Sequence, residues 1–184
     1  MTLAPSQAPR PSLRWLMSTL IPAALAGCPA VKQSTPPPSV LASSPEEAGE
    51  YLVLTGGCND CHTPGWDGSR GTLPASVWLT GSAVGYRGEW GTSYATNLRL
   101  SAQEYTEDAW VQMFRERTTL PPMPWYNYAS MNERDLRAIY RFIRKLGPKG
   151  EPSREAVPPG KEPSTSYLLF ILQQPRGAEP PAQR

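Results

Sequence analysis

Two cysteines and a histidine lie close together at Cys58-Asn59-Asp60-Cys61-His62. A pair of thiols separated by two residues and followed directly by a histidine is the attachment signature of c-type haem. Thiols in this spacing can add across the two vinyl groups of the haem, and the adjacent imidazole then reaches the iron from the same side. The motif therefore predicts one covalent haem c, attached through Cys58 and Cys61, with His62 as the proximal ligand of the iron.

Three other interpretations of the motif fit the sequence less well. A redox-active dithiol would need a thioredoxin-like βαβ context, which the sequence lacks. A zinc site needs about four ligands, but the chain has one histidine and, apart from Cys28 at the boundary of the N-terminal signal, two cysteines. A structural disulfide between Cys58 and Cys61 would leave the adjacent histidine without a role.

The second axial position of the iron needs another ligand, because His62 is the sole histidine of the chain. Met123 lies in Leu120-Pro121-Pro122-Met123-Pro124-Trp125, where the prolines exclude a helix and stiffen the backbone. We predict Met123 as the distal ligand; the alternative is an aromatic turn in which it only fills space. Met131 is the main rival, whereas Met113 is expected in a helix core. Two protein ligands favour electron transfer over catalysis, so no catalytic residue is predicted.

Residues 1–27 have the features of an export signal. Arg10 and Arg14 precede a short apolar run over residues 15–26. The run ends in Leu25-Ala26-Gly27-Cys28, which resembles the lipobox of bacterial lipoproteins. This resemblance implies cleavage before Cys28 and lipid attachment to its sulfur, whereas the alternative is an ordinary signal with a cysteine nearby.

Proline is concentrated at the two ends of the chain, with eight of the 22 in residues 1–43 and seven in residues 149–184. Such segments bury too little apolar surface to offset the entropy of ordering them. We therefore expect a signal peptide (1–27), a tether (28–43), one folded domain (44–148) and a C-terminal extension (149–184). The net charge of +2 gives no indication of a nucleic-acid partner. The sequence contains no run of eighteen or more apolar residues, so we expect no membrane-spanning helix in the mature protein.

Start and stop signals predict three helices within residues 44–148. Residues 63–100 between the first two show neither a helical period nor strict alternation, so we expect a long packed loop that wraps a ligand. The expected fold class is all-α. The helix starts are expected at the capping box Ser44-Pro45-Glu46-Glu47, near Thr106 and at Asn132, and the stops of the first and third at Gly56-Gly57 and Gly147-Pro148.

The order of these segments resembles the class I c-type cytochromes. The resemblance rests on a helix, Gly57-Cys58-Asn59-Asp60-Cys61-His62-Thr63, a loop, the Met123 segment, and Asp135-Leu136-Arg137-Ala138-Ile139-Tyr140. It implies a small cytochrome c fold in which three main helices wrap round one haem, with long irregular loops. It also implies that the first and third helices cross, with Gly49 and Tyr140 as candidates for their contact.

A narrower resemblance concerns Trp90-Gly91-Thr92-Ser93-Tyr94-Ala95-Thr96-Asn97-Leu98, which is similar to cytochromes that accompany periplasmic dehydrogenases. It implies redox partners, namely a dehydrogenase as donor and an oxidase or another cytochrome as acceptor. With lipid on Cys28, the protein is expected on the periplasmic side of a bacterial membrane. The family commonly orients the proximal histidine through a proline carbonyl, and Pro64 and Pro74 are both candidates. Candidates for bonding the haem propionates are Arg87, Trp90, Tyr94 and Asn97.

Three functions compete on the sequence alone. The first, which we expect, is an electron carrier between a periplasmic dehydrogenase and the respiratory chain. The second is a haem enzyme or gas sensor, which would need Met123 absent from the iron or readily displaced. The third is a membrane-tethered structural subunit whose haem mainly holds the fold together. The basic side chains of the third helix are expected on a solvated face or, alternatively, on a docking patch: Arg134, Arg137, Arg141, Arg144 and Lys145.

Overall fold

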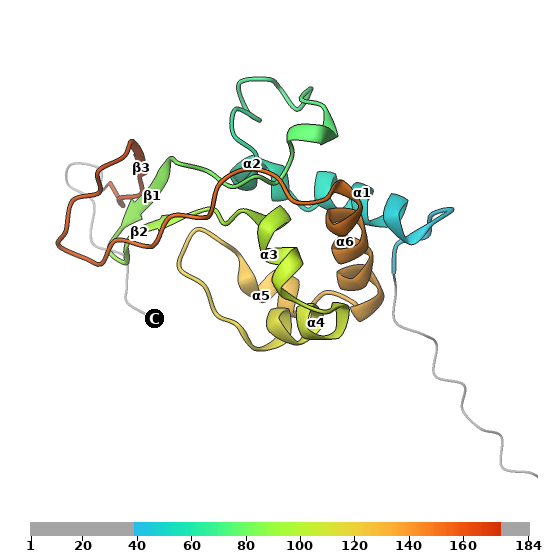
Figure 1. Ribbon diagram of the computed structural model, residues 1–184. Helices are drawn as coiled ribbons and strands as arrows, with labels where there is room; N and C mark the ends of the chain where they lie inside the picture. The colour runs from blue at the N-terminus through green and yellow to red at the C-terminus, as the bar shows by residue number, and fades with distance from the viewer. Residues whose placement is uncertain (1–38, 174–184) are drawn as a thin grey trace, which may run out of the picture. The chain divides into compact units, whose positions relative to one another are not determined.

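The fold is described from a computed structural model of the chain, in which residues 39–173 are placed. The expected signal peptide, the lipobox with Cys28 and most of the tether lie outside the described residues. Residues 174–184, at the end of the C-terminal extension, also lie outside them. Figure 1 shows the order of the helices and strands along the described part of the chain.

The three predicted helices form where their start signals lie. The Ser44 hydroxyl caps the first by accepting a hydrogen bond of 3.2 Å from the amide of Glu47. Thr106 caps the second and Asn132 the third, and the third ends at Gly147, whose φ is 72°. The predicted starts and stops are therefore confirmed. These helices are α1 (Pro45–Thr55), α4 (Glu107–Glu116) and α6 (Glu133–Leu146).

Three short helices and one 3₁₀ turn lie between these longer helices. Each is too short to develop an apolar period that sequence patterns would reveal. One of them, the five-residue α2, consists of the whole Cys-x-x-Cys-His motif. The short elements are α2 (Cys58–His62), η1 (Ala75–Val77), α3 (Leu98–Glu104) and α5 (Trp125–Ala129).

Two strands of a small mixed sheet lie within the segment that the sequence predicts as loop, and the third lies in the C-terminal extension. Strands β1 (Gly85–Gly88) and β2 (Gly91–Tyr94) form an antiparallel hairpin. Strand β3 (Tyr167–Leu169) pairs with β1 in parallel, so the strand order is β2-β1-β3. The prediction of an all-α fold is therefore wrong, since the described residues hold six α-helices and a three-stranded sheet in a mixed α/β fold.

The sheet escapes prediction for a physical reason. Three of the eight residues in β1 and β2 are glycines, which have a low strand propensity and no side chain to show alternation. The third strand comes from the proline-rich C-terminal extension, and its register joins Gly85 to Tyr167. A pairing between segments so distant along the chain leaves no local signal.

Helices α1 and α6 cross as expected, but only one of the two residues suggested for their contact, Gly49, is part of it. A Cβ built on Gly49 would lie 2.1 Å from the carbonyl oxygen of Ala138 and 2.7 Å from the Cβ of Phe142. Gly49 is therefore a contact point, but it faces Ala138 and Phe142 rather than Tyr140. The Tyr140 hydroxyl instead donates a hydrogen bond of 2.8 Å to the carbonyl of Tyr105.

Contacts continue along the C-terminal extension past residue 148. After α6 the chain crosses to the sheet, which is the orange to red part of the ribbon in Figure 1. Val157 exchanges two backbone hydrogen bonds of 2.8 Å with Thr92. Arg87 forms a 2.8 Å ion pair with Glu162. We call residues 149–165 the C-terminal strap, because they run along the segment that leads from β2 to α3.

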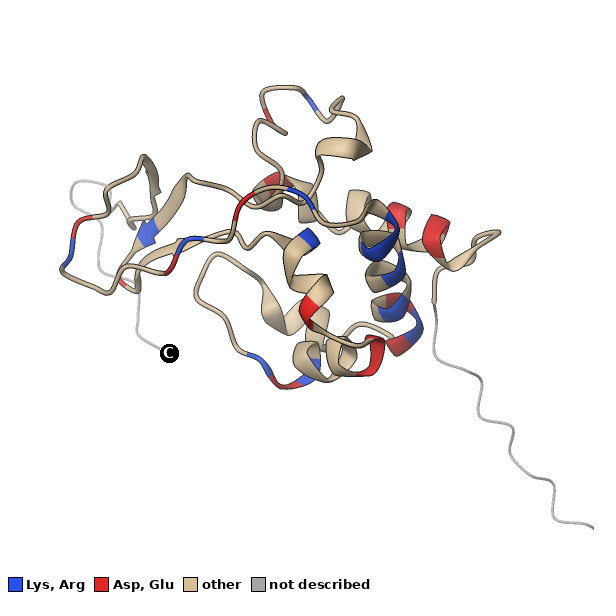
Figure 2. Ribbon diagram, viewed as in Figure 1, with Lys and Arg blue, Asp and Glu red and all other residues tan. Residues whose placement is uncertain are grey.

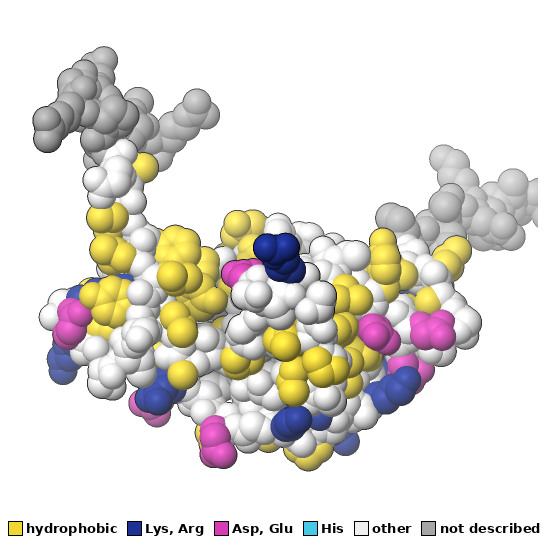
Figure 3. All heavy atoms as spheres, turned by 90° about the horizontal axis from the view of Figure 1, so that it is seen from above, with side chains coloured by type: hydrophobic (Ala, Val, Ile, Leu, Met, Phe, Trp, Pro, Cys, Tyr) yellow, Lys and Arg dark blue, Asp and Glu magenta, His cyan; other side chains and the backbone are white. Residues whose placement is uncertain are grey.

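The surface carries both apolar and charged groups. Large hydrophobic side chains are exposed on the face seen in Figure 3, and Leu168 to Leu172 are all exposed. The basic residues of α6 lie beside acidic ones in Figure 2, and Arg137 pairs with Asp108 at 2.7 Å and with Glu133 at 2.7 Å. In the described part of the chain, no helix is both long and apolar enough to cross a membrane.

Candidate functional site

The motif is positioned by a sharp turn between two helices. Gly56 ends α1, and Gly57 takes the left-handed conformation with φ of 71°, which glycine adopts without steric cost. The next residue, Cys58, begins α2. Because α1 is fixed against α6, the motif is held at the end of the best-packed pair of helices.

Both thiols of the motif are free, and they differ in their surroundings. Cys58 is buried, and burial raises the pKa of its thiol to about 11. Cys61 is half-buried and lies near Tyr86 on β1, whose phenol has its pKa raised mainly by burial and in part by this thiol. The Tyr128 hydroxyl donates a hydrogen bond of 2.9 Å to the carbonyl of Gly56, which fixes the turn before the motif.

His62 is buried, and one of its ring nitrogens is committed to the backbone. Its Nδ1 lies 2.6 Å from the carbonyl oxygen of Thr96, and because a carbonyl can only accept, Nδ1 carries the proton. Burial lowers the pKa of His62, so the imidazole is neutral at pH 7. This tautomer leaves the lone pair of Nε2 free, and a neutral imidazole with one nitrogen bonded to a carbonyl is the usual form of a metal-ligating histidine.

The carbonyl that orients His62 therefore comes from Thr96 rather than from Pro64 or Pro74, the two candidates from the sequence. Thr96 lies within the Trp90 to Leu98 segment singled out above, but the type of a residue does not reveal what its carbonyl does. The main chain of His62 is also fixed, since its carbonyl accepts a hydrogen bond of 2.8 Å from the amide of Gly81.

The donor set fits a covalent haem better than a bare metal ion. Within residues 39–173, no group of three or more His, Cys, Asp or Glu side chains is placed to hold a metal ion. A haem needs only one such side chain, because the porphyrin itself supplies four nitrogen ligands. Two free thiols on a single helical turn, followed by a neutral imidazole, are the groups that covalent attachment and proximal ligation require.

The buried amide of Asn59, inside the motif, has one open hydrogen-bonding position. Its Oδ1 accepts a hydrogen bond of 2.7 Å from the Thr63 hydroxyl, which in turn accepts one of 2.8 Å from the amide of Leu79. Its Nδ2 has no partner among the described residues. A group bound beside Cys58 would supply the acceptor that this buried donor lacks.

Met123 lies outside any helix, in the segment between α4 and α5, as the prolines predict. Its side chain is half-buried against the apolar core that includes Cys58. The Ser93 hydroxyl on β2 donates a hydrogen bond to the carbonyl of Pro121, so the sheet holds this loop. Met131 and Met113 pack against the same core, so packing alone does not choose among the three methionines.

The four side chains considered for haem propionates are engaged elsewhere. Arg87 pairs with Glu162, and the Trp90 indole donates to the carbonyl of Tyr86 at 3.2 Å. The hydroxyl of Tyr94 is bonded to that of Thr165 at 2.8 Å. The side-chain amide of Asn97 donates to two carbonyls of the strap, so its donors are not free for a propionate.

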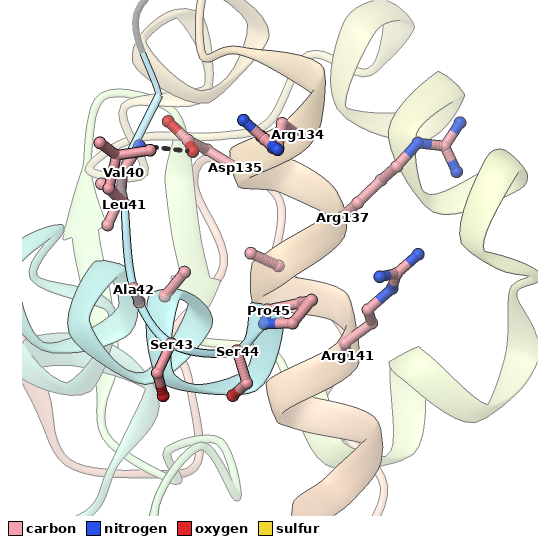
Figure 4. A pocket seen from close by; sticks show the side chains of 12 residues that line it. Val40, Leu41, Ala42, Ser43, Ser44, Pro45, Arg134, Asp135, Arg137 and Arg141 are labelled. Atoms are coloured by element: carbon pink, nitrogen blue, oxygen red, sulfur yellow. Dashed lines mark hydrogen bonds between the residues drawn. The ribbon is translucent and has the colours of Figure 1, made fainter.

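A cavity of about 380 Å³ lies away from the motif, between residues 40–45 and α6. Figure 4 shows Val40 donating its amide hydrogen to Asp135, at 3.0 Å, while the guanidinium groups of Arg137 and Arg141 point away from Ser43 and Ser44. The lining of this cavity includes none of the motif residues.

The comparisons with known proteins are negative. No family model, curated protein or solved structure matches this chain.

Proposed function

We propose that this chain is a monohaem c-type cytochrome that carries electrons and is not an enzyme. The observation that carries the proposal is the hydrogen bond of 2.6 Å between His62 Nδ1 and the Thr96 carbonyl. His62 directly follows a segment with two free thiols, those of Cys58 and Cys61. This bond leaves Nε2 available as a ligand. Neither a structural disulfide nor a redox dithiol would need an oriented, buried imidazole at this place.

Each residue of the site has a separate part in this function. Cys58 and Cys61 would hold the haem through thioether bonds, and His62 would be the proximal ligand. Met123 would be the distal ligand, held in a loop that the prolines stiffen and that Ser93 anchors to β2. When bound, the haem supplies reversible one-electron exchange at its iron. The chain itself orients the imidazole and surrounds it with buried side chains.

The proposed setting follows from sequence features outside the motif. Cys28 would carry lipid and anchor the domain to the periplasmic side of a bacterial membrane through the tether. The donor would be a dehydrogenase, and the acceptor an oxidase or another cytochrome. This part of the proposal rests on the resemblances of the Leu25-Ala26-Gly27-Cys28 and Trp90 to Leu98 segments.

The test is to produce the chain in a host that matures c-type cytochromes and to look for haem that survives denaturation. Cys58→Ser and Cys61→Ser should each leave one thioether, which shifts the absorption band of the reduced pyridine complex, and the double variant should lose covalent haem. Cys28→Ser is the matched control, since it removes the third cysteine and should keep the haem. A native chain whose mass shows no covalent haem would contradict the proposal.

A second measurement separates a carrier from a haem enzyme or gas sensor. With both axial positions filled by protein, the reduced native protein should bind carbon monoxide slowly and only in part. Rapid, stoichiometric binding of carbon monoxide would favour the enzyme or sensor and would contradict the carrier.

A further inference from the structure

The C-terminal strap is connected to His62 through a short series of hydrogen bonds. His62 Nδ1 donates to the carbonyl of Thr96, and the next residue along the chain is Asn97. The Asn97 side chain is almost completely buried, at 1% exposed, and every polar group on it has a partner. These partners divide between the strap on one side and helix α3 on the other.

The strap holds Asn97 at three points. The backbone amide of Asn97 donates to the Ser153 hydroxyl at 2.8 Å. Its Nδ2 donates to the carbonyl of Lys149 at 2.9 Å and to that of Glu151 at 3.0 Å. Gly150, between these two carbonyls, has a φ of 82°, so the strap turns sharply round the amide of Asn97.

The other side of Asn97 caps α3. Its Oδ1 accepts hydrogen bonds of 3.0 Å from the amide of Arg99 and 3.1 Å from the amide of Leu100. The peptide group between Thr96 and Asn97 therefore lies between a strap and a helix cap that both fix its orientation. This peptide group carries the carbonyl on which the His62 imidazole depends.

We infer that Asn97, held by the C-terminal strap, is a positioning residue that sets the strength of the hydrogen bond between Thr96 and His62 and thereby the reduction potential of the site. The inference rests on the proposed function, because a potential requires bound haem. A short, well-aligned bond to Nδ1 makes the imidazole a more basic ligand. A more basic ligand stabilises the oxidised iron, so loosening this bond raises the potential.

Two variants cut the connection at different bonds. Asn97→Ser keeps a side-chain acceptor that caps α3 well but removes both donors to the strap. Ser153→Ala leaves Asn97 intact and removes the acceptor of its backbone amide. Both should raise the midpoint potential of the full-length protein. A tenfold change in the equilibrium between the oxidised and reduced forms is about 59 mV for one electron, and we expect shifts up to this size.

Thr165→Val is the matched control. It removes a different side-chain bond of the strap, the one to the hydroxyl of Tyr94 at the end of β2, with little change in volume. The control should leave the potential where it is in the native protein. If Thr165→Val shifts the potential as much as Asn97→Ser does, any loosening of the strap acts on the site, and the specific role of Asn97 is wrong.

A second measurement reports on the hydrogen bond directly. His62 is the sole histidine, so selective ¹⁵N labelling of histidine in an untagged chain gives one pair of ring nitrogen signals. Exchange of the Nδ1 proton with water, followed in the reduced protein, should be faster in Asn97→Ser and Ser153→Ala than in the native chain. Thr165→Val should leave it unchanged.

The outcomes separate this inference from the proposed function. If the purified native protein carries no haem, the proposed function fails, while the Nδ1 exchange of the protein as purified still tests the connection. If haem is bound but neither potential nor exchange changes in the two variants, even where their melting temperature falls, Asn97 only stabilises the fold and the inference is overturned.

Discussion

Gly49 on α1 lies directly against Ala138 on α6, so closely that a Cβ added to Gly49 would be 2.1 Å from the Ala138 carbonyl oxygen. No side chain fits in that space, so the two helices approach by backbone contact. Because α1 leads through Gly56 and Gly57 straight into Cys58, this contact also decides where the motif lies relative to the core.

Gly49→Ala should therefore destabilise the protein. The added methyl group forces α1 and α6 apart, and overpacking of this kind costs about 1–3 kcal/mol. The measurement is denaturant unfolding of the full-length protein followed by tryptophan fluorescence. Gly68→Ala is the control, since its Cβ would meet only the Gly65 carbonyl at 3.7 Å, and it should change stability by less than about 0.5 kcal/mol. Equal effects of the two substitutions would contradict the backbone contact.

Arg99 is a second residue on which stability should depend. Its guanidinium is buried and donates to the carbonyls of Gly147, Leu146 and Ser76. Two of these carbonyls lie at the C-terminal end of α6, where a cation also interacts well with the helix dipole. Arg99→Met should leave the carbonyls of Gly147 and Leu146 without this donor, while the carbonyl of Ser76 keeps its bond of 2.9 Å from the Lys149 ammonium. The free energy of unfolding should fall by about 3 kcal/mol.

Arg154→Met supplies the comparison for Arg99, because Arg154 is exposed on the strap and makes no hydrogen bond or ion pair among those found in the described residues. The free energy of unfolding of Arg154→Met should lie within about 0.5 kcal/mol of that of the native protein. Arg99→Lys should recover part of the loss, since an ammonium group can still reach one or two of the carbonyls. If Arg99→Met lowers the free energy of unfolding no more than Arg154→Met does, the three hydrogen bonds of Arg99 add nothing to stability.

The helices could be predicted because their signals are local. A helix cap needs only a residue such as Ser44, Thr106 or Asn132 and the amides one turn later. Each cap works in isolation from the rest of the fold. The sequence therefore predicts where the long helices begin without knowledge of what they pack against.

The sheet and the strap could not be predicted in the same way. Gly91, for example, has a φ of 94°, and a Cβ there would lie 2.2 Å from the carbonyl oxygen of Val157. The sequence shows a glycine, but its reason is the approach of a segment far along the chain. A proline-rich composition also gives no indication that Val157 bonds to β2 or that Ser153 bonds to Asn97.

The candidate site likewise has a part that the local sequence reveals and a part that only the fold reveals. Cys58, Cys61 and His62 form a contiguous motif, so their types and spacing point to the chemistry. The partner of His62 is a backbone carbonyl, that of Thr96, and every residue has one. Only the fold selects which carbonyl meets the imidazole.

Lipid attachment at Cys28 is tested at the N-terminus of the mature protein. The native chain should be isolated with membranes, and its first residue should be a cysteine carrying acyl chains, because one chain alone gives only marginal anchoring. Cys28→Ser should remain uncleaved or be released in soluble form. Mass spectrometry that finds an unmodified Cys28 in the mature protein, or cleavage at another position, would rule out the lipobox.

Met123→Ala tests the distal ligand. If Met123 binds the iron, the oxidised native protein should show the weak near-infrared band of sulfur–iron ligation. Met123→Ala should abolish this band, lower the reduction potential and open the iron to carbon monoxide. The loop should remain in place in the variant, because its anchor is the bond from the Ser93 hydroxyl to the carbonyl of Pro121, which the substitution does not remove.

Met131→Leu is the decisive partner of that experiment, because Met131 and Met123 pack against the same core. Leucine conserves the apolar volume, so this variant should keep the near-infrared band and lose less than about 1.5 kcal/mol of stability. The sequence favours Met123 because Pro122 and Pro124 restrict its backbone, so that the thioether loses little conformational entropy when it binds. If the band instead survives in Met123→Ala and vanishes in Met131→Leu, Met131 is the ligand, and the proline-rich loop around Met123 only packs against the core.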